Sequence, residues 1–148
     1  MLKHAERRVL PFTPEQMYDL VAAVDKYPEF LPWCMGARIR KRQPGLLVAD
    51  LLIGFKVFRE RFTSRVTLDQ DNLEITVDYL DGPMKHLINE WQFLPHEQGC
   101  EVDFFVEFEF RSIVLQKAIG ALFTEAVKRM VAAFEARAYD LYGDGSSS

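Results

Sequence analysis

The alternation between residues 101 and 110 constrains the fold more than any other feature of the sequence. Val102, Phe104, Val106, Phe108 and Phe110 recur at every second position, and acidic residues fill most of the positions between them. Strict alternation predicts a β-strand with one buried face and one solvated face, which is typical of antiparallel sheets. We interpret the acidic side as a solvated face whose carboxylates pair across strands with Arg7 or Arg59.

Six more strands are predicted over residues 3–10, 35–42, 46–53, 57–68, 73–80 and 87–93, and turn-forming residues separate them. Short turns between successive strands indicate an antiparallel sheet. A helix is predicted to begin at Thr13, where Pro14 suits the first helical position and Gln16 completes a capping box. It extends to about Val24, and the prolines that follow limit the next segment to a short turn.

A helical period from Ser112 to Tyr142 predicts one C-terminal helix of roughly 45 Å, which ends at Gly143. This helix is the only predicted element long enough to cover the apolar face of the sheet. We therefore expect an α+β helix-grip fold, in which a curved antiparallel sheet of about seven strands wraps around the long C-terminal helix. Residues 1–143 would form a single START-like domain, and residues 144–148 would form a disordered tail.

The large apolar residues exceed what a seam between one helix and one sheet needs, since the chain holds 12 Phe and is 49% hydrophobic. For any single residue a dense core is the simpler interpretation. For the set we predict an apolar cavity that binds a ligand, because a curled sheet around one helix leaves volume between them. The predicted ligand-binding residues are Tyr27, Phe30, Leu31, Trp33, Phe55, Phe58, Glu60, Phe62, Tyr79, Asn89, Trp91, Phe93, Phe104, Phe108, Phe123, Val127 and Met130.

Two polar members of this set are placed on the inner face by the strand alternation. Glu60 lies between Phe58 and Phe62, and Asn89 has apolar neighbours at the same spacing. A buried carboxylate is costly without a partner. One interpretation is that Glu60 and Asn89 orient the polar head of a ligand; the other is that they satisfy backbone groups or that a bulge shifts the face.

A segment rich in aromatic residues and proline, from Tyr27 to Trp33, either plugs one end of the core or forms the lid of the cavity. It precedes a basic strand in which Arg38, Arg40 and Arg42 are predicted to bind a surface. That surface is either anionic lipid headgroups or ribosomal RNA phosphates, and an ordinary charged edge strand is the third interpretation. Residues 1–66 carry 12 Lys and Arg against 7 Asp and Glu, whereas residues 67–148 carry 6 against 15.

Catalytic and metal-binding motifs are not found in the sequence. Neither a nucleophile elbow nor a phosphate-binding glycine loop occurs, and His4, His86 and His96 lack metal-ligand spacing. Cys34 and Cys100 fit buried thiols in a reducing compartment, with a disulfide as the alternative. No apolar run reaches the length of a membrane span. We expect a cytoplasmic protein without a covalent cofactor or metal, with peripheral attachment to the inner face of the membrane as an alternative.

Four segments together resemble the coenzyme Q-binding protein family of the START and polyketide-cyclase-like superfamily. They are YPEFLPWC (27–34), ERFTSRV (60–66), GPMKHLINEWQF (82–93) and AFEARAYDLYG (133–143), and Met84 stands where the family pattern has Phe. The resemblance implies non-enzymatic binding of ubiquinone or a similar isoprenoid lipid, for delivery to respiration or biosynthesis. Bacterial members include ribosome-association toxins, which implies binding to a ribosomal subunit as the alternative function. An enzyme of the polyketide-cyclase kind is the third alternative, for which only Glu60 is a candidate acid or base.

Overall fold

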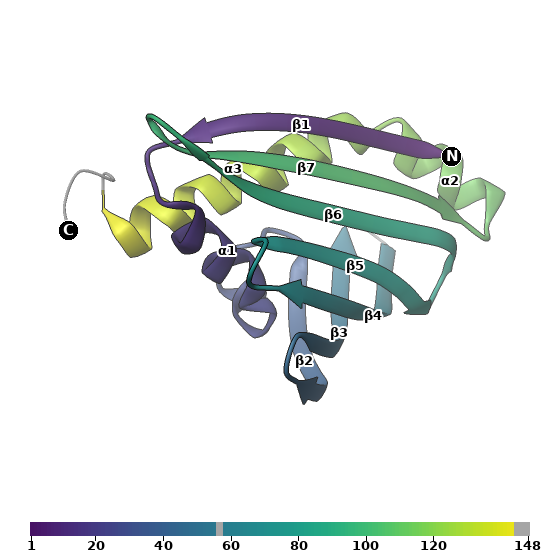
Figure 1. Ribbon diagram of the computed structural model, residues 1–148. Coiled ribbons are helices and arrows are strands. Elements are labelled where there is room, and N and C mark those ends of the chain that lie inside the picture. The colour runs from purple at the N-terminus through teal and green to yellow at the C-terminus, as the bar shows by residue number, and fades with distance from the viewer. Residues whose placement is uncertain (56–57, 144–148) are drawn as a thin grey trace.

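The structure, a computed structural model, describes residues 1–55 and 58–143. Seven antiparallel strands form one sheet in the order β1-β7-β6-β5-β4-β3-β2, and the sheet curves around the helices (Figure 1). In chain order the elements are β1 (Leu2–Leu10), α1 (Pro14–Ala22), the short 3₁₀ helix η1 (Val24–Glu29), β2 (Cys34–Gln43), β3 (Leu46–Phe55), β4 (Phe58–Asp69), β5 (Glu74–Asp81), β6 (Met84–His96), β7 (Gly99–Phe110), α2 (Ile113–Gly120) and α3 (Phe123–Tyr142). The predicted strands and the helix-grip arrangement are confirmed.

The start of α1 matches the capping box predicted from the sequence. The backbone N–H of Gln16 donates to Thr13 Oγ1 over 3.0 Å, and the N–H of Thr13 donates to Gln16 Oε1 over 2.9 Å. These bonds satisfy backbone donors that the first helical turn leaves without partners. The helix therefore begins at Pro14, which fixes the apolar side of α1 against the sheet.

The prediction of one continuous C-terminal helix is wrong. The helical segment breaks after Gly120, and the N–H of Leu122 donates to the carbonyl of Ile119 over 2.9 Å in a tighter turn. Glycine weakens a helix interior by about 1 kcal/mol, so this position is where the helix bends most easily. The 20 residues of α3 span about 30 Å, and α2 lies at one end of the sheet as a separate element (Figure 1).

A solid core fills the space between α1, strands β6 and β7 and the C-terminal half of α3. Phe93 is fully buried, and its ring meets that of Tyr18 edge-on at 6.1 Å. Ala138 and Cys100 are 0% exposed, and Phe12 packs edge-on against Tyr139 of α3 at 5.0 Å. The predicted buried thiols are confirmed, because Cys34 and Cys100 are both buried and free.

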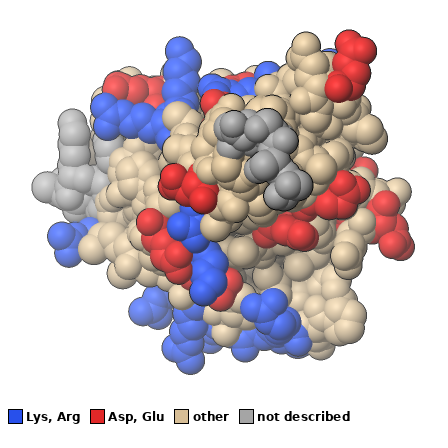
Figure 2. Space-filling model, turned by 90° about the vertical axis from the view of Figure 1, so that its left-hand side faces the viewer, with Lys and Arg blue, Asp and Glu red and all other residues tan. Residues whose placement is uncertain are grey.

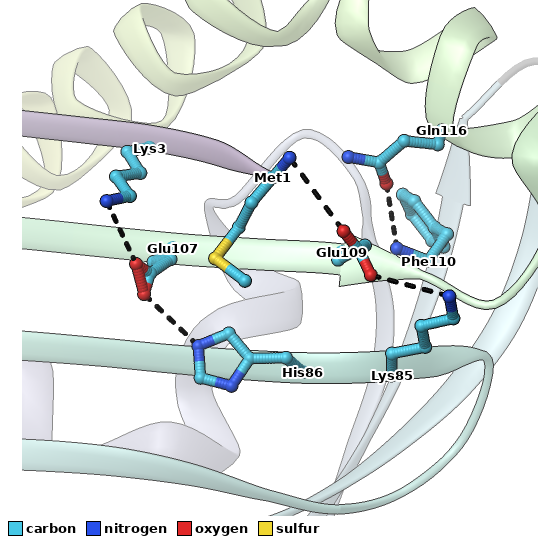
Figure 3. A network of polar contacts seen from close by, with 8 residues as sticks. All are labelled: Met1, Lys3, Lys85, His86, Glu107, Glu109, Phe110 and Gln116. Carbon is cyan, nitrogen blue, oxygen red and sulfur yellow. Dashed lines mark hydrogen bonds and ion pairs between the residues drawn. The ribbon is translucent and has the colours of Figure 1, made fainter.

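The acidic outer face of β7 forms cross-strand ion pairs, as Figure 3 shows for its end near the N-terminus. Glu107 lies 3.6 Å from Lys3 Nζ on β1 and 3.2 Å from His86 Nε2 on β6. Asp103 lies 3.7 Å from Arg7 Nε, as predicted. The predicted pairing with Arg59 is wrong, because Arg59 belongs to β4, and the neighbours of β7 are β1 and β6.

Candidate ligand-binding cavity

A cavity of about 320 Å³ lies between the concave face of the sheet and the helices α2 and α3. Its wall takes side chains from β2 to β7, from the end of α2, from α3 as far as Phe134 and from the segment that follows α1. This size falls at the lower end of the range for small-molecule sites. Of the predicted ligand-binding residues, eleven line the cavity: Tyr27, Leu31, Trp33, Phe62, Asn89, Trp91, Phe104, Phe108, Phe123, Val127 and Met130.

Four predicted residues lie elsewhere. Phe93 is buried in the solid core beneath α1, and Phe30 packs edge-on against Phe134 at 5.2 Å without lining the cavity. Tyr79 is engaged at the β5–β6 turn, where its hydroxyl accepts the N–H of Met84 over 3.0 Å. Glu60 is half-buried beside its cross-strand partner Ile53, and Ile53 lines the cavity.

The predictions for Phe55 and Phe58 concern side chains that lie outside the part of the chain that the structure describes. Several wall residues were not predicted, and two signals could have found them. Leu51 and Ile53 share the inner face of β3 by the same alternation that identified Phe62 on β4. Ile119 and Leu122 also line the cavity, and the helical period had already put both on the same apolar face as Phe123.

The segment from Tyr27 to Trp33 covers part of the cavity, as its interpretation as a lid requires. Tyr27, Leu31 and Trp33 belong to the cavity wall. The hydroxyl of Tyr27 donates to the carbonyl of Val21, and its ring meets Phe134 edge-on at 5.4 Å. Burial raises the pKa of the Tyr27 phenol, so this group stays neutral at physiological pH.

The amide of Asn89 has protein partners on both sides. Its nitrogen donates to the carbonyl of Phe105 over 2.9 Å, and its oxygen accepts the indole N–H of Trp91 over 2.9 Å. An amide nitrogen carries two N–H donors, so one remains for a ligand. Asn89 therefore satisfies a backbone carbonyl, as one of its two interpretations requires. Its remaining N–H is compatible with the other interpretation, in which Asn89 orients the polar head of a ligand.

A polar seam that the sequence did not reveal joins the edge strand β1 to α3. Glu6 accepts from Arg8 Nε over 2.7 Å and lies 3.0 Å from His4 Nε2, and Arg8 donates to Glu135 of α3 over 2.7 Å. Burial opposes the ionisation of Glu6, but the bonds from His4 and Arg8 outweigh it and lower the pKa of its carboxyl. A small gap of about 20 Å³ lies at this seam, beside Trp91, Phe104 and Phe134.

Arg38, Arg40 and Arg42 are exposed on the edge strand β2. Arg40 lies 3.7 Å from Asp50, and β4 adds the exposed Arg61. Lys and Arg gather at the lower end of the molecule in Figure 2, toward which the β2–β3 turn points in Figure 1. The three arginines of the predicted basic surface are thus exposed on the edge strand, and their role in binding stays a prediction.

Side chains suited to metal binding do not gather in groups of three or more within the described residues. The cavity wall contains neither a carboxylate nor a histidine among these residues. None of the described helices is both long and apolar enough to cross a membrane. The chemistry that the described wall offers is apolar contact and a few hydrogen bonds.

Comparisons with known proteins agree with this geometry. Residues 10–135 match the family described as polyketide cyclase / dehydrase and lipid transport. The chain is 38% identical to the ribosome association toxin RatA of Rickettsia prowazekii over 144 residues, which cover 95% of this chain and 99% of that protein. It is 36% identical to the mitochondrial coenzyme Q-binding protein COQ10 homolog B of Xenopus laevis, over 96% of this chain and 60% of that protein.

Among solved structures, the 18 kDa protein CC1736 from Caulobacter crescentus superposes with a TM-score of 0.79 and is 39% identical. The aligned region covers 97% of this chain and 99% of CC1736. The match over residues 10–135 and the close relatives lead to one conclusion: this chain belongs to the polyketide cyclase / dehydrase and lipid transport family, with the START-like helix-grip fold.

Proposed function

We propose that the protein binds ubiquinone or a similar isoprenoid lipid in its cavity and presents this lipid to respiratory or biosynthetic partners. The observation that carries the proposal is the cavity itself, which is lined almost entirely by apolar and aromatic side chains. Burial of apolar surface contributes about 25 cal/mol per Å², so a prenyl chain needs few hydrogen bonds to bind tightly. The relative named as a coenzyme Q-binding protein supports the choice of ligand.

The proposal favours binding over catalysis for a chemical reason. A cyclase would need an acid or base at the wall, and the only acid candidate from the sequence, Glu60, is not among the lining residues. Asn89 is the proposed donor to a ligand carbonyl, through its remaining N–H. We place Glu60 beside the wall, so Glu60→Ala should weaken quinone binding less than about threefold, below the effect of losing a direct hydrogen bond.

Two measurements test lipid binding. Mass spectrometry of an organic extract of the purified protein should detect a co-purifying prenyl lipid. Titration with a ubiquinone analogue that carries a ten-carbon tail should quench Trp33 and Trp91 saturably, since both indoles line the cavity. Absence of a prenyl lipid from the extract together with unsaturable quenching would remove the proposal.

A second candidate function is binding to a ribosomal subunit through Arg38, Arg40 and Arg42. The exposed basic end of the sheet and the relatives named RatA favour it. Co-sedimentation with ribosomal subunits should fall steeply with salt if phosphates are the target. The double variant Arg38→Glu, Arg42→Glu should abolish this co-sedimentation. The control double variant Lys117→Glu, Lys128→Glu makes the same change of charge at exposed sites elsewhere and should still co-sediment.

The same pair of variants tests the membrane alternative. Flotation with vesicles that contain acidic lipid should recover the wild-type protein and lose the Arg38 and Arg42 variant, because each cation near such a surface contributes about 1 kcal/mol. Equal flotation of both double variants would mean that the basic end is not the attachment surface.

A further inference from the structure

Ser64 occupies an unusual position in the cavity wall. Its side chain is buried, with 5% of its surface exposed, and it lines the cavity from the middle of β4. Its hydroxyl takes part in none of the hydrogen bonds formed by the described residues. The adjacent hydroxyl of Thr63, on the other face of β4, donates to Asp50 over 2.6 Å. Among the described residues, the one fully buried side-chain oxygen without a partner is Asp103 Oδ1, so the Ser64 oxygen keeps some accessible surface at the cavity wall.

The residue directly beside Ser64 in the wall is also small. The cross-strand partner of Ser64 on β3 is Ala49, which is 1% exposed and also lines the cavity. Directly opposed residues on neighbouring strands have Cβ atoms about 5 Å apart, so two small side chains leave a shallow niche between larger neighbours. Those neighbours on the same face are Phe62 and Val66 along β4, and Leu51 along β3.

The residue beside Ser64 on the third strand uses its hydroxyl elsewhere. Tyr79 on β5 is the other partner of Ser64 in register, but it is not part of the cavity wall. Its hydroxyl accepts the N–H of Met84 at the β5–β6 turn. The Ser64 hydroxyl is therefore a polar group without a protein partner in an otherwise apolar part of the wall.

We infer that the niche formed by Ala49 and Ser64 is a subsite for one small oxygen substituent of the ligand, a carbonyl, ether or hydroxyl. This inference rests on the proposed lipid-binding function and narrows the ligand class to prenyl lipids with an oxygenated ring or end group. A hydroxyl both donates and accepts, so it suits each of these groups. Asn89 lies two strands away across β5, and the wall thus offers polar contacts at two separate points.

The test compares two probes with the same tail. One is the ubiquinone analogue with a ten-carbon tail, and the other is decylbenzene, which carries a ring and the tail but no oxygen. Dissociation constants are measured by displacement of a fluorescent apolar dye from the delipidated protein. Ser64→Ala should weaken binding of the quinone about three- to tenfold, the effect of one hydrogen bond, and leave decylbenzene unchanged or tighter.

Thermal melting without ligand gives a second measurement. Because the hydroxyl lacks a protein partner, Ser64→Ala should melt at the same temperature as the wild type or higher. Thr67→Ala, at an exposed position on the outer face of the same strand, is the matched control and should leave both probes unaffected. A lower melting temperature for Ser64→Ala would reveal a structural role and overturn the inference.

The outcomes separate the two proposals. If the wild type binds both probes and Ser64→Ala affects them equally, the subsite is refuted and lipid binding stands. If the wild type binds neither probe, the proposed function is refuted, and the subsite with it.

Discussion

Filling the cavity from α3 tests directly whether the space is empty. Ala126 lines the cavity from the first half of that helix, beside Val127 and Met130. Burying a Phe side chain contributes about 1.5–3 kcal/mol, and replacing Ala by an aromatic residue in a helix costs about 0.5 kcal/mol. Ala126→Phe should therefore raise the free energy of unfolding by about 1–2 kcal/mol, and the melting temperature by roughly 2–8 °C at this chain length.

The matched control lies on the same helix. Ala138 is 0% exposed in the solid core, so Ala138→Phe should lower the free energy of unfolding by about 1–3 kcal/mol through overpacking. Urea denaturation and thermal melting of delipidated protein measure both variants. Ala126→Phe should also lose saturable binding of the quinone analogue. If Ala126→Phe destabilises the protein as much as Ala138→Phe, the cavity is filled by protein and the binding proposal loses its basis.

Three further predictions concern stability. Gly99→Ala should destabilise the protein by at least about 2 kcal/mol in urea denaturation, because φ is +138° and a Cβ would collide with the backbone oxygen of Leu10, whereas Gly36→Ala should be tolerated. Arg8→Met removes the ion pair that joins β1 to α3 and should cost about 1 kcal/mol, with a smaller loss in 1 M salt; equal losses at both salt concentrations would contradict an ionic role. Burial raises the pKa of the Cys100 thiol from 9.0 to about 11. The folded protein therefore keeps this proton more tightly than the unfolded chain, and the resulting contribution to the free energy of unfolding is complete below pH 9 and is lost as the pH rises toward 11. Denaturation curves from pH 8 to 11 should show this loss, and Cys100→Ala should reduce it.

The alternation of apolar and polar residues predicted the strands and the inner face of each strand. It did not predict how far the cavity extends along a strand. Trp91 and Phe93 share a face of β6, yet one lines the cavity and the other lies in the core, because α1 covers only one end of the sheet. Alternation assigns a side chain to a face, and the placement of the covering helices decides what that face meets.

The break between α2 and α3 exposes a second limit. Gly120 is the sole local signal for it, and a single glycine is often tolerated within a helix. The niche at Ala49 and Ser64 depends on the register of β3 and β4, which neither strand reveals alone. Contacts that join distant segments therefore had to come from the structure.

The sheet has a packed end under α1 and a hollow end toward α2. This division partly separates the residues that stabilise the fold from the residues that would contact a ligand. Phe93 and Cys100 are buried at the packed end and do not line the cavity, whereas wall residues such as Phe104 and Val127 belong to the buried core and border the cavity as well. A wall side chain that borders empty space lacks packing partners on that side, so it gains less dispersion energy than a side chain that is packed all around. Substitutions at the hollow end can thus change the ligand preference while the packed end keeps the domain folded. This arrangement makes the chain a practical scaffold for engineered binding of other apolar molecules.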